Sequence, residues 1–229
     1  MKPTLFQDTR TLVRDFVFGM EDGLVSNLGL VLGVWQGGGG QFAIVLAGLA
    51  SMFAGAFSMS AGSYLSAKSQ REVYEQEIRA TKKFLKSNPQ QCLLEMQGIL
   101  KAEGFSAPEV KMMCRHFVQH DQSTFTKNYI QKKLGLSEAR FEFPLKNAAM
   151  MFFSFLAGSL FPILPFMLTS ESTAAILAPV VTIAALFLVG WAKTVYTKRS
   201  WLKSGIEIVL VGVGAGIIGY IVGLVLSAV

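Results

Sequence analysis

The sequence predicts an all-α integral membrane protein with five transmembrane helices and a small cytosolic helical insert between helices two and three. Apolar residues make up 52% of the 229-residue chain and charged residues only 16%, with a mean hydropathy of +0.44. Long uncharged runs alternate with short basic segments, and one polar stretch interrupts them. Because a soluble protein carries about 25% charged residues, this composition argues against a cytosolic enzyme, a disordered chain and a disulfide-stapled secreted module.

The uncharged runs place the five helices. The first run has 45 residues, and three later runs have 24, 21 and 22. About 20 helical residues cross roughly 30 Å of hydrocarbon, so each later run is long enough for one span. The first run is too long for one span, and Gly37–Gly40 divides it. We therefore predict helices over about 16–36, 41–67, 145–169, 172–196 and 205–228.

The basic residues predict the orientation. Of the 21 Lys and Arg residues, three lie near the start, 14 in 68–146 and four at the turn between helices four and five. The segments expected on the other side carry none. The positive-inside rule then places the N-terminus and the insert in the cytosol and the C-terminus on the opposite side. The net charge of +6 thus indicates an anionic lipid bilayer as partner rather than nucleic acid. From the short tails we expect a bacterial inner membrane.

The chain divides into residues 1–67, 68–143 and 144–229. The middle part is polar and helix-favouring, and Asn88-Pro89, Gly104 and Gly135 cut it into short helices. The first of these helices can continue directly from helix two. Ser106 and Glu109 have the spacing of a capping box, and Asp121 is a candidate cap for the last helix. We therefore predict a small helical bundle.

Asp22 is the first candidate functional residue, because it lies inside helix one. An ionised carboxylate in hydrocarbon costs at least a few kcal/mol, so such a residue usually faces a partner or an ion path. A structural hydrogen bond to a neighbouring helix is the alternative. Glu21 is rotated by about 100° from Asp22, so the two acids cannot face one narrow path equally.

Several other residues have side chains that bind metals. Met52 and Met59 share one face of helix two, where thioethers suit soft metal ions or simply fill the apolar interior. His116 and His120 are spaced four apart and could clasp a divalent ion with Asp121, although two solvated histidines are the simpler interpretation. The sequence shows no Walker loop, catalytic carboxylate pair or nucleophile triad, so we expect neither an enzyme nor a permanently bound cofactor.

Four motifs together resemble one family. FGMEDGLVSNLGLVLGV, GLASMFAGAFSMSAGSYLSAKSQREVYEQE, FPLKNAAMMFFSFLAGSLFPILPFML and WLKSGIEIVLVGVGAGIIGYIVGLVL occur in this order around a helical insert. In this combination and order the chain resembles the vacuolar iron transporter family, the CCC1-like transporters, over its whole length.

The resemblance implies a homodimer that moves Fe²⁺ and/or Mn²⁺ out of the cytosol in exchange for protons. The implied path runs between the protomers, lined by the helix-one Asp and the helix-two Met, which match Asp22 and Met59. A carboxylate can exchange a metal ion for a proton, and a thioether favours Fe²⁺ over Mg²⁺ or Ca²⁺. Glu21 and Met52 are possible secondary path residues.

The insert departs from the family pattern. The family's insert ligands align with Thr81, Phe84, Cys92, Glu95, Tyr129, Ile130 and Lys133, of which only Glu95 keeps the ligand type. The insert is also net basic, which repels a divalent cation. We therefore expect no family-type metal cluster there, and at most weak capture by Glu72, Glu75, Glu77 and Glu95, with His116 and His120 as a substitute pair. A membrane scaffold or metal sensor that has lost transport is the alternative hypothesis.

Overall fold

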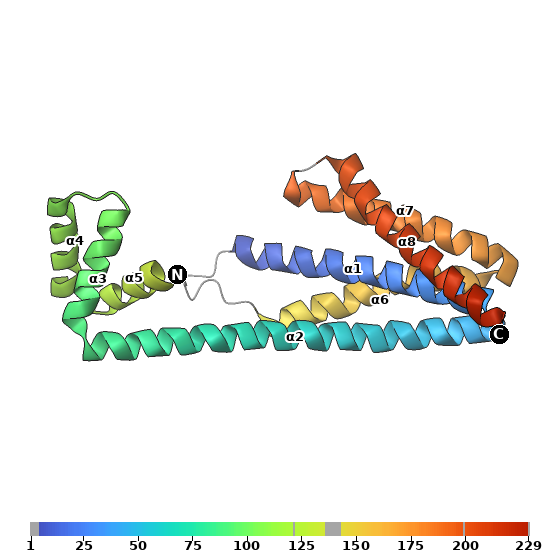
Figure 1. Cartoon of the computed structure of the whole chain (residues 1–229), viewed down its shortest axis with the longest axis horizontal. Coiled ribbons are helices and arrows are strands. Elements are labelled where there is room, and N and C mark those ends of the chain that lie inside the picture. The colour runs from blue at the N-terminus through green and yellow to red at the C-terminus, as the bar shows by residue number, and fades with distance from the viewer. Residues whose placement is uncertain (1–4, 121, 136–142, 199, 229) are drawn as a thin grey trace. The chain divides into compact units, whose positions relative to one another are not determined.

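The computed structural model describes residues 5–120, 122–135, 143–198 and 200–228, and their side chains except those of 5–10, 117–120, 122, 196 and 197. All the secondary structure in this part is helical (Figure 1). The helices are α1 (Leu5–Gln36), α2 (Gln41–Ser87), α3 (Pro89–Ala102), α4 (Ala107–His120), α5 (Gln122–Leu134), α6 (Pro144–Leu168), α7 (Glu171–Thr197) and α8 (Trp201–Ser227). The predicted all-α class is confirmed.

Five helices of the described chain, α1, α2, α6, α7 and α8, are long and apolar enough to cross a membrane. This agrees with the five spans predicted from the charge gaps. Helix α1 begins earlier than predicted, at Leu5, and its apolar part is Thr11–Gln36. Helix α2 continues through 47 residues to Ser87, because no Gly-Pro or Asn-Pro break occurs before Asn88-Pro89.

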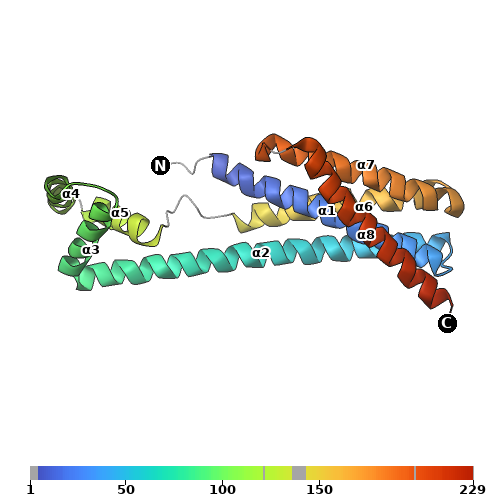
Figure 2. The same ribbon diagram turned by 45° about the horizontal axis from the view of Figure 1, so that its top comes forward.

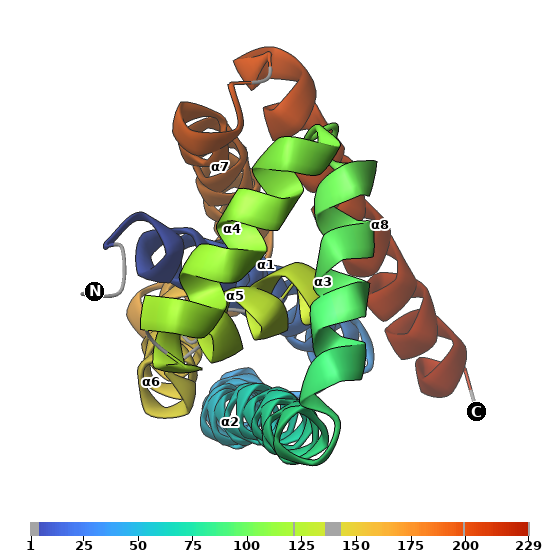
Figure 3. The same ribbon diagram turned by 90° about the vertical axis from the view of Figure 1, so that its left-hand side faces the viewer.

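Residues 67–135 and residues 8–66 with 143–228 form two separate compact units. In the first unit, α3, α4 and α5 pack together with the end of α2 (Figure 3). Its core consists of Leu85, Cys92, Met96, Leu100, Val110, Cys114, Phe125 and Tyr129. Helix α4 starts with the expected box, since the backbone N–H of Ser106 donates to Glu109 Oε2 at 2.8 Å. Asp121 lies outside the described residues.

The second unit contains the five apolar helices, and α1 packs against α6, α7 and α8 (Figure 2). One apolar cluster joins α1 to α2, α6 and α7 around Val31, Met52 and Ile163. Another joins α1 to α7 and α8 around Leu24, Leu186 and Ile208. Because α1 takes part in both clusters, its polar residues lie inside or at the edge of the bundle.

Glycines allow α1 to approach its neighbours closely. A Cβ on Gly19 would overlap Ser154 Oγ on α6, and one on Gly23 would lie 2.5 Å from the carbonyl oxygen of Phe155. Further along α1, Gly33 faces the backbone of Gly219 on α8. Small residues commonly mediate such contacts between membrane helices. Gly219 of α8 is therefore a helix-packing residue.

A set of hydrogen bonds, called here the Gln41–Glu171 tie, connects the start of α2 with the end of α6 and the start of α7. The Gln41 backbone N–H, at the start of α2, donates to Glu171 Oε1 at 2.6 Å. The Gln41 side-chain amide donates to the carbonyl oxygens of Phe166 and Thr169 at 2.7 and 3.0 Å. These bonds satisfy groups that helix ends leave unpaired, and the Glu171 carboxylate also lies at the positive end of the α2 dipole.

Replacing Glu171 with alanine should therefore destabilise the protein by about 1–2 kcal/mol, the usual cost of losing a helix cap. Ser172→Ala, on the next residue of α7, is the matched control, and we expect it to change stability by less than about 0.5 kcal/mol. Thermal unfolding of the two purified variants in the same detergent measures the difference. Equal midpoints would show that the tie does not stabilise the fold.

Candidate functional site

Asp22 lies well inside the apolar part of α1, eleven residues after Thr11. At 1.5 Å per residue this is about 16 Å along the helix axis. Its side chain is half-buried. Its backbone carbonyl oxygen accepts a hydrogen bond from Ser26 Oγ at 2.5 Å. Within the described part of the chain, no hydrogen bond or ion pair neutralises the Asp22 carboxylate.

Glu21 has different neighbours. It lies within electrostatic range of Lys193 on α7 and of Glu207 on α8, as well as of Asp22. The carboxylate of Glu21 therefore has a basic group nearby, which Asp22 lacks among the described residues. The adjacent acids thus occupy distinct electrostatic environments.

The two methionines of α2 also differ in environment. Met59 is half-buried, whereas Met52 is 7% exposed and belongs to the apolar cluster with Ile44 and Ile163. The thioether of Met52 packs against hydrocarbon side chains there. Met59 is the more accessible sulfur of the pair.

Helices α1 and α2, which carry the two candidate residues, both pack against Phe155 of α6. A Cβ on Gly23, next to Asp22, would lie 2.5 Å from the Phe155 carbonyl oxygen. A Cβ on Gly55, one turn before Met59, would lie 2.5 Å from the Phe155 ring. Asp22 and Met59 therefore lie on two helices that pack against the same residue of α6.

The structure adds a buried acid that the sequence analysis did not single out. Asp15, on α1, is 2% exposed, and its Oδ1 accepts hydrogen bonds from Arg14 Nε and Nη2 at 3.1 and 3.0 Å. Its Oδ2 has no hydrogen-bond partner in the described part of the chain. The sequence feature that could have pointed to Asp15 is the adjacent Arg14-Asp15 pair at the start of the apolar part of α1. Because Arg14 neutralises it, Asp15 is a weaker candidate than Asp22 for a cation.

A buried polar contact lies further along α1, five residues after Asp22. The Asn27 side-chain amide donates to Ser159 Oγ on α6 at 2.9 Å, and Asn27 is fully buried. This contact is the kind of interhelical hydrogen bond that membrane helices use for packing. It places one polar contact within the α1–α6 seam.

Most of the insert's acids that the structure describes have basic partners. Glu72 pairs with Lys68 at 3.9 Å, and Glu75 pairs with Arg71 and Arg79 at 2.8 and 3.8 Å. Glu103 pairs with Lys132. These carboxylates are neutralised by their own chain, which weakens them as ligands for a divalent ion. Among the described side chains, no three His, Cys, Asp or Glu residues are close enough to hold a metal ion.

Glu95 of the insert accepts hydrogen bonds from two side chains of α5. Its Oε2 accepts hydrogen bonds from Tyr129 Oη at 2.5 Å and from Lys133 Nζ at 2.6 Å. The bonds from Lys133 and Tyr129 hold the pKa of Glu95 below its usual value. Burial, together with the bond to Glu95, raises the pKa of Tyr129. The Lys133 ammonium also lies 5.2 Å from the ring centres of Phe84 and Tyr129.

Lys133 lies at the centre of residues that the resemblance aligns with the family's ligand positions. It contacts Phe84, Glu95 and Tyr129, and Cys92 lies in the same core. The cation at their centre is the Lys133 ammonium. The histidine pair is less informative. His116 is exposed, and the side chain of His120 lies outside the described residues.

Replacing Lys133 with glutamine should loosen the insert at neutral pH. The ion pair is 35% and 33% exposed, so we expect a loss of about 0.5–1 kcal/mol. Because the pKa of Glu95 is lowered in the folded state, the stabilisation is present at neutral pH and fades as the pH falls through that pKa.

The labelling rate of the two cysteines measures this loosening. Cys92 and Cys114, the two cysteines of the chain, are free and buried in the insert core, so a dipyridyl disulfide reports local opening. The variant should label faster than wild type at neutral pH, by about two- to fivefold. The ratio should approach one in acid. A ratio independent of pH would contradict a role for the Glu95 charge.

Comparison with known proteins adds independent information. A model of the VIT family matches residues 13–224. Vacuolar iron transporter 1 of Arabidopsis thaliana is 29% identical over 202 residues, covering 88% of this chain and 80% of that protein. Vacuolar iron transporter 2 of Oryza sativa subsp. japonica is 30% identical over 203 residues, covering 88% and 82%. Protein CCC1 of Saccharomyces cerevisiae is 27% identical over 215 residues, covering 90% and 66%.

The family match extends from the first apolar helix to near the end of the last one and includes both Asp22 and Met59. It confirms the resemblance drawn from the four motifs. Because the family model matches most of its length, the chain belongs to the VIT family.

Proposed function

We propose that this protein is a transporter that moves Fe²⁺ and/or Mn²⁺ across a membrane, out of the cytosol, in exchange for protons. Its membership of the VIT family supports transport of iron, since the relatives are named iron transporters. Asp22 and Met59 line the proposed path, which runs between the two protomers of a homodimer. The proposed host is a bacterial inner membrane, with the N-terminus and the insert on the cytosolic side.

The half-buried, unneutralised carboxylate of Asp22 is the observation that carries this proposal. A charge inside an apolar helix is costly unless it meets an opposite charge or water. A passing divalent cation supplies the missing charge, and a proton neutralises the same oxygen when the ion leaves. Exchange at one carboxylate therefore couples the metal to the proton.

Met59 contributes selectivity in this proposal. Carboxylate oxygens alone suit the hard ions Mg²⁺ and Ca²⁺, whereas a thioether adds a soft ligand. In this proposal Met59, which is half-buried, contacts an ion passing along α2, whereas Met52 packs in the apolar core.

Replacing Met59 with leucine should therefore lower Fe²⁺ uptake into proteoliposomes by about tenfold, the factor for about 1.4 kcal/mol, without reducing folded protein. Leucine keeps the apolar volume and removes only the sulfur. Met167→Leu, at an exposed position of α6, is the matched control and should transport like wild type. Unchanged Fe²⁺ uptake in Met59→Leu would remove this residue from the path.

A membrane scaffold or metal sensor that has lost transport is the second candidate. The neutralised acids of the insert favour it, since Glu72, Glu75, Glu95 and Glu103 all pair with basic side chains. This candidate requires that folded wild-type protein in liposomes moves no metal. The same uptake assay therefore separates the two functions before any variant is made.

A further inference from the structure

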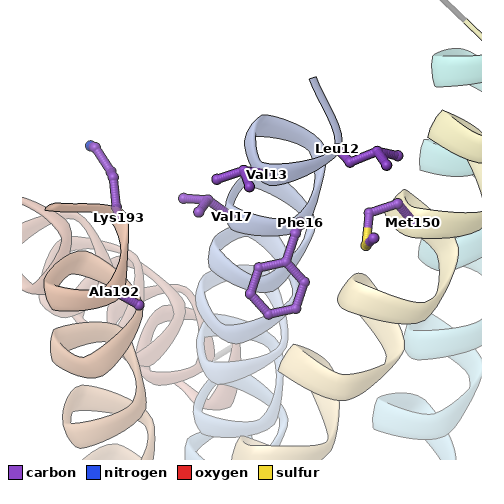
Figure 4. A pocket seen from close by; sticks show the side chains of 7 residues that line it. All are labelled: Leu12, Val13, Phe16, Val17, Met150, Ala192 and Lys193. Atoms are coloured by element: carbon purple, nitrogen blue, oxygen red, sulfur yellow. The ribbon is translucent and has the colours of Figure 1, made fainter. Parts of the chain in front are cut away.

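A groove on the surface of the apolar unit is lined mainly by apolar side chains, unlike the surroundings of Asp22. It has a volume of about 420 Å³ and lies between α1, α6 and α7 (Figure 4). Val13, Phe16 and Val17 of α1 form its central wall, and Met150 of α6 lies at one side. Its volume is within the range of about 300–1,000 Å³ that small-molecule sites occupy.

The groove opens to the surroundings of the bundle rather than to its interior. Phe16 is 41% exposed, and Ala192, which lines the groove from α7, is exposed as well. All three helices are candidate membrane spans, so the medium at this surface is the bilayer. An apolar recess in hydrocarbon is filled most favourably by a hydrocarbon chain, because an empty recess loses its packing contacts.

Among the described residues that line the groove, Lys193 is the charged one. Lys193 follows Ala192 on α7, and its side chain extends away from the apolar wall (Figure 4). The exposed indoles of Trp191 and Trp201 flank this part of the chain, as tryptophans do at the level of lipid headgroups. Lys193 is also within electrostatic range of Glu21, but an ammonium has three N–H donors and can serve a phosphate in addition.

We propose that this groove binds one anionic phospholipid, with an acyl chain along Val13, Phe16 and Val17 and the phosphate at the Lys193 ammonium. The apolar wall and the single cation are arranged in the order that such a lipid presents its own chain and headgroup. Zwitterionic lipids carry their own ammonium group, which offsets the attraction to lysine. Basic pockets between membrane helices on the cytosolic side favour anionic headgroups for this reason.

The test uses the full-length protein, stripped of lipid in detergent, and native mass spectrometry to count bound lipids. The probes are phosphatidylglycerol and phosphatidylcholine with identical acyl chains. Wild type should bind phosphatidylglycerol about fivefold more tightly, the ratio expected for one lysine near an anionic surface. Lys193→Gln should abolish this preference. Lys193→Arg should keep it, as should the control Lys203→Gln, whose exposed lysine lies outside the groove.

A second variant tests the groove itself. Ala192→Phe fills the recess from an exposed position and should weaken binding of both lipids at least threefold. Glycerol phosphate, the headgroup without chains, should not displace the bound lipid. The proposal is overturned if wild type shows no preference, if the preference survives Lys193→Gln, or if glycerol phosphate competes as well as the lipid does. It is also overturned if Ala192→Phe alters only the oligomeric state, which would make the groove a protein interface.

Discussion

Asp22→Ala should reduce metal uptake into proteoliposomes by at least about a hundredfold, because the path then has no charge to stabilise a dication in hydrocarbon. Asp22→Asn keeps the size and hydrogen-bonding capacity of the side chain and should fail in the same way. Asp22→Glu keeps the charge and should retain part of the flux. The set of three therefore separates the charge of residue 22 from its shape.

The control for this series is Glu207→Gln, which removes an exposed acid from another membrane helix and should leave uptake near the wild-type value. Uptake is measured with a metal-sensitive dye inside the vesicles, at equal amounts of monodisperse protein. Asp22 is not neutralised within the described chain, so its removal should not unfold the protein. Wild-type flux in Asp22→Asn would exclude this carboxylate from the path.

Gly219→Ala should destabilise the protein strongly for a change of one methyl group. A Cβ at this position would overlap the carbonyl oxygen of Gly29, and that atom belongs to backbone that cannot rotate away. Helices α1 and α8 would have to separate, which loosens the helix that carries Asp22. We expect a loss of about 3 kcal/mol or more, at the upper end for overpacking.

Gly214→Ala is the matched control on the same helix. No atom lies within 4 Å of a Cβ at Gly214, so its added methyl group meets open space. Alanine in place of glycine in a helix is favourable by up to about 1 kcal/mol, so this variant should be as stable as wild type or more so. Thermal unfolding in detergent compares the two. Equal stability of Gly219→Ala and Gly214→Ala would show that α1 and α8 do not touch at Gly29 and Gly219.

The fold class could be predicted from the sequence because the cost of a charge in hydrocarbon acts at each residue separately. The charge gaps alone indicate five spans, and local breakers mark the short helices, as the positive φ values of Gly104 and Gly135 show. Helix starts were less accurate. The segment 5–15 before Phe16 carries four charged residues and so lies outside the uncharged run, yet it is helix-compatible, and α1 therefore begins at Leu5.

Contacts between distant segments could not be predicted in this way. The Gln41–Glu171 tie and the Glu95–Tyr129–Lys133 network depend on which helices become neighbours, and no local pattern encodes that. Asp22 was identifiable because an acid inside a mostly apolar helix is conspicuous by itself. Asp15 was missed because its burial against α6 is a property of the folded bundle, although the adjacent Arg14 is visible in the sequence.

The most direct test of the proposed function is simultaneous measurement of metal and protons. Purified protein is reconstituted into liposomes that contain an Fe²⁺-sensitive dye and a pH-sensitive dye, and Fe²⁺ is added outside. We expect Fe²⁺ to enter while the internal pH rises, with both signals lost in Asp22→Asn. Metal entry without proton movement would contradict exchange at Asp22, and folded wild-type protein that moves neither ion would contradict transport altogether.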